Sequence, residues 1–221
     1  MDKPCGKGVE GDFMIYINVS ELYLSSEESL FPELKQIPAM QRRRLSTIAK
    51  LAINSALSAL KNTSVDYIIW VSQYGDEHKT FKILADVLQD QTPSPTQFST
   101  SVHNAVSGLY SILCQDATPS TSLAATWNDA LIEAYSWLKT TKVENAKVLT
   151  VFYEESMPSV YIESHPFDAF ALAGIISLGN ENLALSFTPE HVAKNYYEDV
   201  LAFYHFWEQT SDVQFKEWKK I

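Results

Sequence analysis

The sequence predicts an α/β protein in which helices flank a mixed β-sheet. Short apolar runs rich in β-branched and aromatic residues, such as 13–19 and 66–73, are typical of buried strands. Longer segments that repeat apolar residues every three or four positions, such as 43–60 and 127–139, are typical of amphipathic helices. Because the two kinds of segment alternate along the chain, the elements should pack in layers around a sheet.

The order of the elements defines the predicted sheet. After the first strand–helix–strand unit come helices at 78–90 and 101–115, an extended piece at 119–124, helix 127–139 and strands at 146–155 and 168–179. We expect the last two strands to form an antiparallel edge of a mixed five-stranded sheet. The run at 182–187 is a further short candidate strand.

The chain divides into three predicted parts. Residues 1–12, which contain three glycines, should form a flexible N-terminus. Residues 13–188 should form the α/β domain. Residues 189–221 start with a proline and are rich in Tyr, Phe and Trp, so they should form a helical C-terminal tail that covers part of the apolar surface of the domain.

Composition excludes several classes of function. The formal net charge of −10 disfavours binding to nucleic acid. No apolar run is long enough to predict a membrane span. Cys5 and Cys114 have neither a disulfide framework nor metal-ligand spacing. We therefore expect a cytoplasmic protein that holds no metal and no cofactor.

The sequence contains no familiar catalytic or nucleotide-binding motif. A Ser–His–Asp set can be composed from Ser101, His103 and Asp129, although nothing in their spacing supports a triad. Glu154 and Glu155 are the last two residues of a predicted strand, and we expect them to lie at a solvated strand end rather than to act as acid and base.

Three stretches resemble a known family. They are Phe31–Ser46, Ile68–Asp76 and Ser94–Ile112, the last reading SPTQFSTSVHNAVSGLYSI. They are similar to the β-ketoacyl synthase N-terminal-like proteins, in particular to chain-length-factor-like subunits of aryl polyene ketosynthases. The resemblance covers roughly residues 13–190. It implies one half of a thiolase-like fold, whereas complete ketosynthases carry two halves, with their two histidines in the second half.

The resemblance also implies where a catalytic cysteine would lie, at the start of the helix after the third strand. Aligning on Asp129–Ala134 places Ala124 at that position, and aligning without gaps from Asn104 places Trp127 there. Neither residue can attack a thioester. Cys114 lies earlier, within an apolar helix, where a thiol is expected to be inert.

A non-catalytic member could still act through a partner. In this family, third strands pair across a dimer, and the segment before them reaches the acyl tunnel of the partner. Ordinary helix packing is the alternative for that segment, and a hydrogen-bonded helix start is the alternative for its histidine. The residues that the resemblance implies at the tunnel or interface are Phe98, Ser101, Val102, His103, Asn104, Ala105, Val106, Pro119, Ser120, Thr121, Ser122 and Leu123.

These observations predict a chain-length-factor-like subunit that pairs with an active β-ketoacyl-ACP synthase, as a heterodimer or a larger assembly, in aryl polyene synthesis. An acyl carrier protein would be met mainly through the partner. Arg42, Arg43 and Arg44 are predicted to contact it, with a solvated helix start as the alternative. Two other functions stay open: a small thioester hydrolase that uses a serine, and a chaperone that stabilises the ketosynthase without shaping its tunnel.

Overall fold

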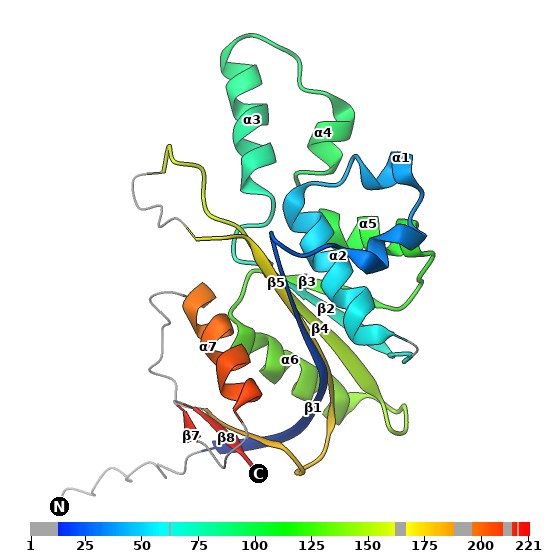
Figure 1. Ribbon diagram of the computed structural model, residues 1–221, viewed down its shortest axis with the longest axis vertical. Coiled ribbons are helices and arrows are strands. Elements are labelled where there is room, and N and C mark those ends of the chain that lie inside the picture. The colour runs from blue at the N-terminus through cyan, green and yellow to red at the C-terminus, as the bar shows by residue number, and fades with distance from the viewer. Residues whose placement is uncertain (1–12, 62, 162–166, 188–195, 210–213, 216) are drawn as a thin grey trace, which may run out of the picture.

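The computed structural model describes residues 13–61, 63–161, 167–187, 196–209, 214–215 and 217–221 (Figure 1). The predicted flexible segment 1–12 and the start of the predicted tail lie outside these residues. The elements in chain order are β1 (Phe13–Ser26), η1 (Pro32–Gln36), α1 (Ala39–Arg42), α2 (Thr47–Leu60), β2 (Tyr67–Val71), α3 (Glu77–Leu88), α4 (Pro95–Ser99), α5 (Ala105–Cys114), β3 (Ser120–Leu123), α6 (Trp127–Thr140), β4 (Lys147–Glu154), β5 (Phe170–Leu178), β6 (Leu183–Phe187), α7 (Tyr196–Glu208), β7 (Gln214–Phe215) and β8 (Trp218–Lys220).

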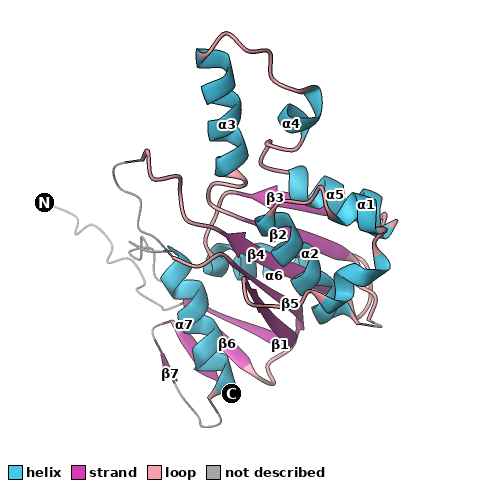
Figure 2. Cartoon of the chain, turned by 45° about the horizontal axis from the view of Figure 1, so that its top comes forward, coloured by secondary structure: helices cyan, strands magenta, loops and turns pink. Residues whose placement is uncertain are grey.

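All described strands belong to one mixed sheet in the order β3-β2-β4-β5-β1-β6-β8-β7. Figure 2 shows this sheet with β3 at one end and β7 at the other. The β3, β2 and β4 strands are parallel, and the remaining pairs are antiparallel. The predicted mixed sheet is confirmed, but it has eight strands rather than five. The β4–β5 pair is antiparallel as predicted, yet it lies in the middle of the sheet, because the long β1 pairs on the far side of β5.

The β1 strand is also longer than predicted. The predicted strand ended at Val19, where the apolar run stops, but the strand continues to Ser26. A register shift between Ser20 and Tyr23, with Glu21 in a left-handed conformation, bends the strand and lets both halves pair with β5. The first half of β1 also pairs with β6 on its other side.

Helices cover both faces of the sheet (Figure 1). On one face, α2 is buried along most of its length and packs with α5 against the sheet. Polar contacts also fix α2: Ser55 Oγ lies 3.0 Å from the carbonyl oxygen of Ala171 and 2.8 Å from Ser25 Oγ, and Asn54 Nδ2 donates to Ser25 Oγ. On the other face, α6 and α7 build a second core with the sheet. No helix among the described residues is long and apolar enough to cross a membrane.

Two helices extend away from these layers. Figure 1 shows α3 and α4 beyond the body of the molecule, and neither helix contains a buried residue. Phe81, Leu84 and Leu88 form an apolar stripe on α3, with Leu88 exposed by 86%. The helix predicted over 101–115 begins only at Ala105, because residues 101–104 form turns.

The end of the chain is partly helical, as predicted. The α7 helix begins at Tyr196, and β7 and β8 follow it as two short strands. β8 pairs with β6, and Trp218 of β8 is completely buried and packs against Phe203 and Phe206 of α7. The tail therefore extends the sheet as well as covering α6, which accounts for two of the additional strands.

Candidate functional site

The start of α6 is the position at which the resemblance implies a nucleophile. Ala124 lies exposed in the turn between β3 and α6, and Trp127 is the first residue of the helix. The indole of Trp127 is fully buried and packs against Phe203 of α7, with 5.4 Å between ring centroids. A bulky core side chain thus fills the space beneath the helix start, and neither aligned position offers a thiol.

The N-terminus of α6 is capped by side chains of the helix itself and of the residue before it. The Asp129 amide donates to Thr126 Oγ1 at 3.2 Å, and Asp129 Oδ2 accepts from the Thr126 amide at 3.0 Å. This reciprocal pair is a capping box, which satisfies the amides of Thr126 and Asp129 with the chain's own side chains. The Asp129 carboxylate also lies in the first turn, where it interacts favourably with the positive end of the helix dipole.

The described cysteine, Cys114, lies on α5 and not at the start of α6. Burial and the nearby Asp116 carboxylate raise the pKa of its thiol to about 11. A thiol with this pKa is almost entirely protonated near neutral pH, and the thiolate is the nucleophile. The predicted inertness of Cys114 agrees with this environment.

The three residues of the composed triad have separate local partners. Ser101 Oγ donates to the Phe98 carbonyl, and Asp129 belongs to the capping box on α6. His103 Nε2 lies 2.8 Å from the Ser72 carbonyl oxygen, so this nitrogen carries the proton and donates. With Nε2 engaged in this way, the imidazole is a structural donor at the turn before α5, and the geometry gives no support to a hydrolase triad.

A buried carboxylate that sequence reasoning missed supports His103. Glu154 at the end of β4 is fully buried, so the expected solvated strand end is wrong for this residue. One carboxylate oxygen accepts from the Gln73 amide at 2.7 Å, and both lie 3.3 Å from Ser72 Oγ. Ser72 Oγ also accepts from the Gly75 amide at 2.7 Å. Glu154 thereby fixes the turn after β2 on which His103 rests.

The environment of this carboxylate is unusual. Burial raises the pKa of Glu154 to about 8, although the hydrogen bonds from Gln73 and Ser72 act in the opposite direction. The pKa of the neighbouring Glu155 is raised to about 7, again chiefly by burial. The missed signal was the position of β4: this strand lies inside the sheet with helices on both faces, and its side chains from Val148 to Glu154 are all buried.

Gly75 shows how closely His103 packs on this turn. A Cβ at position 75 would lie 3.5 Å from the His103 Cα and 3.6 Å from its Cδ2. Gly75 also has a φ of +72°, a conformation that glycine adopts readily. The turn after β2 and the segment before α5 therefore form one packed unit with Glu154 beneath it.

The predicted tunnel segment, residues 98–106, contains both exposed and buried side chains. Phe98, at 62% exposure, and Val102 project from the surface, whereas Val106 is buried in the core beneath α2. Asn104 is the exposed N-cap residue of α5, and Ala105 begins the helix. Of this segment, Phe98 and Val102 are therefore the apolar side chains most available to a partner.

The predicted pairing strand lies at the edge of the sheet. β3 hydrogen-bonds to β2 on one side and has no strand on the other among the described residues. Ser120, Thr121, Ser122 and Leu123 make up this strand, and Pro119 precedes it, with its carbonyl bonded to the Ile68 amide. Ser122 Oγ also donates to Ser107 Oγ at 3.3 Å, which joins the edge strand to α5.

The predicted basic contact lies elsewhere, on the outer side of α2. Arg42 donates from Nη1 to the Leu34 carbonyl at 3.1 Å, while Arg43 and Arg44 are exposed. Arg42 is the last residue of α1, and Arg43 and Arg44 lie in the link to α2. No group of three or more metal-ligating side chains occurs in the part of the chain that the structure describes.

Comparison with known proteins identifies the family. The model of the β-ketoacyl synthase N-terminal domain matches residues 19–217, so the chain belongs to that family. It is similar to a chain in the structure of the ketosynthase ApeO in complex with its chain length factor ApeC from Xenorhabdus doucetiae. That similarity has a TM-score of 0.74 at 24% identity and covers 93% of this chain and 98% of that chain, which confirms the thiolase-like fold.

Other similarities are weaker. The HMG-CoA synthase PksG from Bacillus subtilis aligns with a TM-score of 0.42 at 12% identity, over 80% of this chain and 42% of that chain. This chain thus spans less than half of the length of that enzyme. A search of curated proteins found no match.

Proposed function

We propose that this chain is a non-catalytic, chain-length-factor-like subunit that pairs with an active β-ketoacyl-ACP synthase and shapes its acyl tunnel in aryl polyene synthesis. The observation that carries the proposal is Trp127, a buried indole at the start of the helix where the family holds its nucleophile. The similarity over 98% of a chain from a ketosynthase–chain length factor complex supports it. The cytoplasmic location predicted from the sequence belongs to the same proposal.

Two surfaces support pairing with another chain. β3 is an edge strand that can accept a strand from a partner. The α3 helix presents Leu84 and Leu88 to solvent, and large exposed apolar side chains that lie together mark interaction sites. In this proposal the two-fold related third strands pair, and the partner also covers the outer side of α3.

Co-expression with a full-length ketosynthase tests the pairing. We expect the two chains to purify together, and light scattering to give a mass that contains both in equal number. A chain that stays monomeric with every ketosynthase offered would refute the proposal. If that monomer hydrolysed acyl thioesters and lost the activity on Ser101→Ala, the hydrolase alternative would replace it.

The tunnel role makes a separate prediction. Val102→Trp enlarges an exposed side chain of the tunnel segment, so we expect the complex to form but its products to be shorter by about one elongation step or more, because added bulk blocks the growing chain. Mass spectrometry of the products measures the length. Ile112→Trp, at an exposed position on the same side of the sheet outside this segment, is the control. Unchanged product length with Val102→Trp would favour the chaperone alternative.

Contact with an acyl carrier protein, mainly through the ketosynthase, is part of the proposal. The sequence prediction assigns Arg42, Arg43 and Arg44 to this contact, and their exposure is compatible with it.

A further inference from the structure

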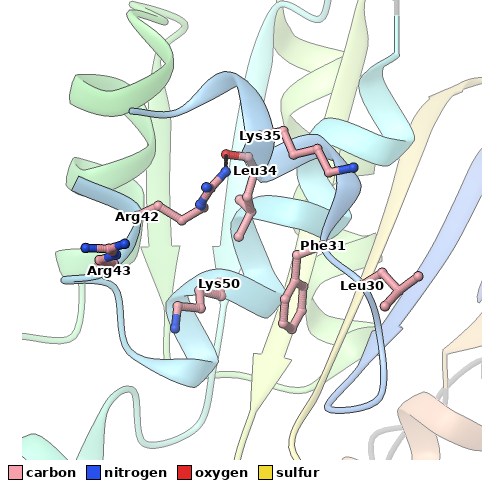
Figure 3. Close-up of a pocket in the computed structure, with 7 residues that line it drawn as sticks. All are labelled: Leu30, Phe31, Leu34, Lys35, Arg42, Arg43 and Lys50. Carbon is pink, nitrogen blue, oxygen red and sulfur yellow. Dashed lines mark hydrogen bonds between the residues drawn. The ribbon is translucent and has the colours of Figure 1, made fainter. Parts of the chain in front are cut away.

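A pocket of about 390 Å³ lies between η1, α1 and the first turn of α2 (Figure 3). Its volume is in the range of pockets that hold small molecules. Three apolar and four basic side chains line it: Leu30, Phe31, Leu34, Lys35, Arg42, Arg43 and Lys50. A pocket with this wall offers both an apolar surface and a strong positive charge to one ligand.

The charge of this wall contrasts with that of the chain. The whole sequence has 17 basic and 27 acidic residues, yet no acidic side chain lines the pocket. Among the described residues the salt bridges are Lys61–Glu21 and Lys79–Asp76, so the pocket cations have no carboxylate partner there. Four cations around one opening repel one another, and a bound anion would relieve that repulsion.

One of these cations is held in place. Arg42 Nη1 donates to the Leu34 carbonyl at 3.1 Å, which fixes the guanidinium at the pocket wall. Figure 3 shows this bond as a dashed line. A guanidinium has five N–H donors, so donors remain for an anionic ligand. An anion would therefore meet a side chain that is already ordered, which lowers the entropic cost of binding.

The apolar part of the pocket wall lies opposite Arg43. Figure 3 shows Phe31 and Leu30 across from Arg43. Phe31 has φ 46° and ψ 54°, a left-handed conformation that is uncommon for an aromatic residue. Leu30 is 92% exposed, so a hydrocarbon group placed against it would remove apolar surface from water.

We propose that this pocket binds a small amphipathic anion, a carboxylate or phosphate attached to a hydrocarbon or aromatic group. The anionic group contacts Arg42, Arg43 and Lys50, and the apolar group covers Leu30 and Phe31. The site is formed by this chain alone, so it depends neither on a ketosynthase partner nor on the tunnel role. It shares Arg42 and Arg43 with the proposed carrier-protein contact, so the two ligands would compete for these side chains.

Calorimetric titration of the full-length chain tests the proposal. The probes are octyl phosphate and octanoate, which distinguish a phosphate from a carboxylate. Two further compounds each carry one part of the proposed ligand: 1-octanol has the hydrocarbon chain without an anionic group, and inorganic phosphate is the anion without a hydrocarbon chain. We expect both anionic octyl probes to bind at one site per chain, and each half-ligand to bind at least about tenfold more weakly. Binding of 1-octanol as tight as octyl phosphate would overturn the proposal.

Variants locate the site. Arg43→Gln with Lys50→Gln removes two charges without changing the core, and we expect binding of octyl phosphate to weaken by about tenfold or more, since hydrogen bonds to charged groups contribute about 1.5–3 kcal/mol. Leu30→Ser should weaken octyl phosphate but leave inorganic phosphate unchanged. Arg44→Gln, an exposed neighbour that does not line the pocket, is the control.

Two results would contradict the proposed site. An equal loss of binding with Arg44→Gln would mean that the probes respond to surface charge in general. Binding of a poly-glutamate peptide together with no binding of either octyl probe would mean that the basic cluster serves an acidic protein segment instead of a small amphipathic anion.

Discussion

Trp127→Ala should lower the free energy of unfolding of this chain by about 3–5 kcal/mol, as is usual when a fully buried large aromatic side chain is truncated. The indole is completely buried at the first residue of α6 and packs against Phe203 of α7. Truncation would leave a cavity between α6, α7 and the sheet. Urea unfolding of wild type and variant, followed by circular dichroism, measures the loss.

Two further variants keep this prediction testable if Trp127→Ala does not fold. Trp127→Phe should lower the free energy of unfolding much less than Trp127→Ala. It keeps most of the apolar volume and removes an indole N–H that has no hydrogen-bond partner among the described residues. Trp137→Ala on the same helix is the matched control, since that indole is only half-buried and stacks on Tyr67. A loss below about 1 kcal/mol for Trp127→Ala would contradict the structural role assigned here.

The same pair of side chains shows what the tail contributes. Because Trp127 of α6 packs against Phe203 of α7, a double-mutant cycle of Trp127→Ala and Phe203→Ala should give a coupling energy of about 0.5–1.5 kcal/mol. A residue that stabilises the fold in this way cannot easily be replaced by a catalytic cysteine. The energetic role of Trp127 and the proposed loss of catalysis are thus connected.

Much of the fold could be predicted from the sequence because local patterns were strong. The apolar run of β4 and the periodicity of α6 have the same positions in prediction and structure to within a few residues. The second half of β1 was missed because its alternation is interrupted by a bulge at Ser20–Tyr23, and β8 was missed because three residues carry too little pattern. The position of β4–β5 within the sheet depends on long-range pairing that no local signal contains.

The candidate site was less predictable, for a physical reason. In a strand that is buried on one face, the alternation of polar and apolar residues shows which side chains face the solvent. This signal does not apply to β4, which is covered on both faces. Glu154 therefore looks like the polar end of a strand in the sequence and is a buried, hydrogen-bonded carboxyl group in the structure. The pocket beside Arg42 was likewise visible only as an arginine cluster, because Leu30 and Phe31 reach it through tertiary packing.

Glu154 should make the stability of the chain fall as the pH rises. Its pKa is about 8 in the folded chain, against 4.5 for the free side chain, so between these values the folded state binds more protons than the unfolded state. The stability contributed by the protonated carboxyl group is complete below about pH 4.5 and is lost as the pH rises through about 8. The full difference is on the order of 3–5 kcal/mol.

Glu154→Gln removes this dependence while keeping the shape of the side chain. The amide oxygen can still accept from the Gln73 amide, so the turn that supports His103 should be retained. We expect the variant and wild type to have similar free energies of unfolding at pH 5, and the variant to be more stable by a few kcal/mol at pH 9. Urea unfolding at pH 5, 7 and 9 measures the free energy of unfolding of the wild type and of the variant.

Glu155, whose pKa is raised to about 7, titrates in the same window, but it is present in both proteins and cancels in the difference. Glu144→Gln, at an exposed position, is the control and should leave the pH profile of wild type unchanged. A difference between wild type and Glu154→Gln that stays constant from pH 5 to pH 9 would show that Glu154 is ionised throughout. A carboxyl carbon signal that titrates near pH 8 by NMR, and disappears in Glu154→Gln, would assign the shifted pKa to this residue directly.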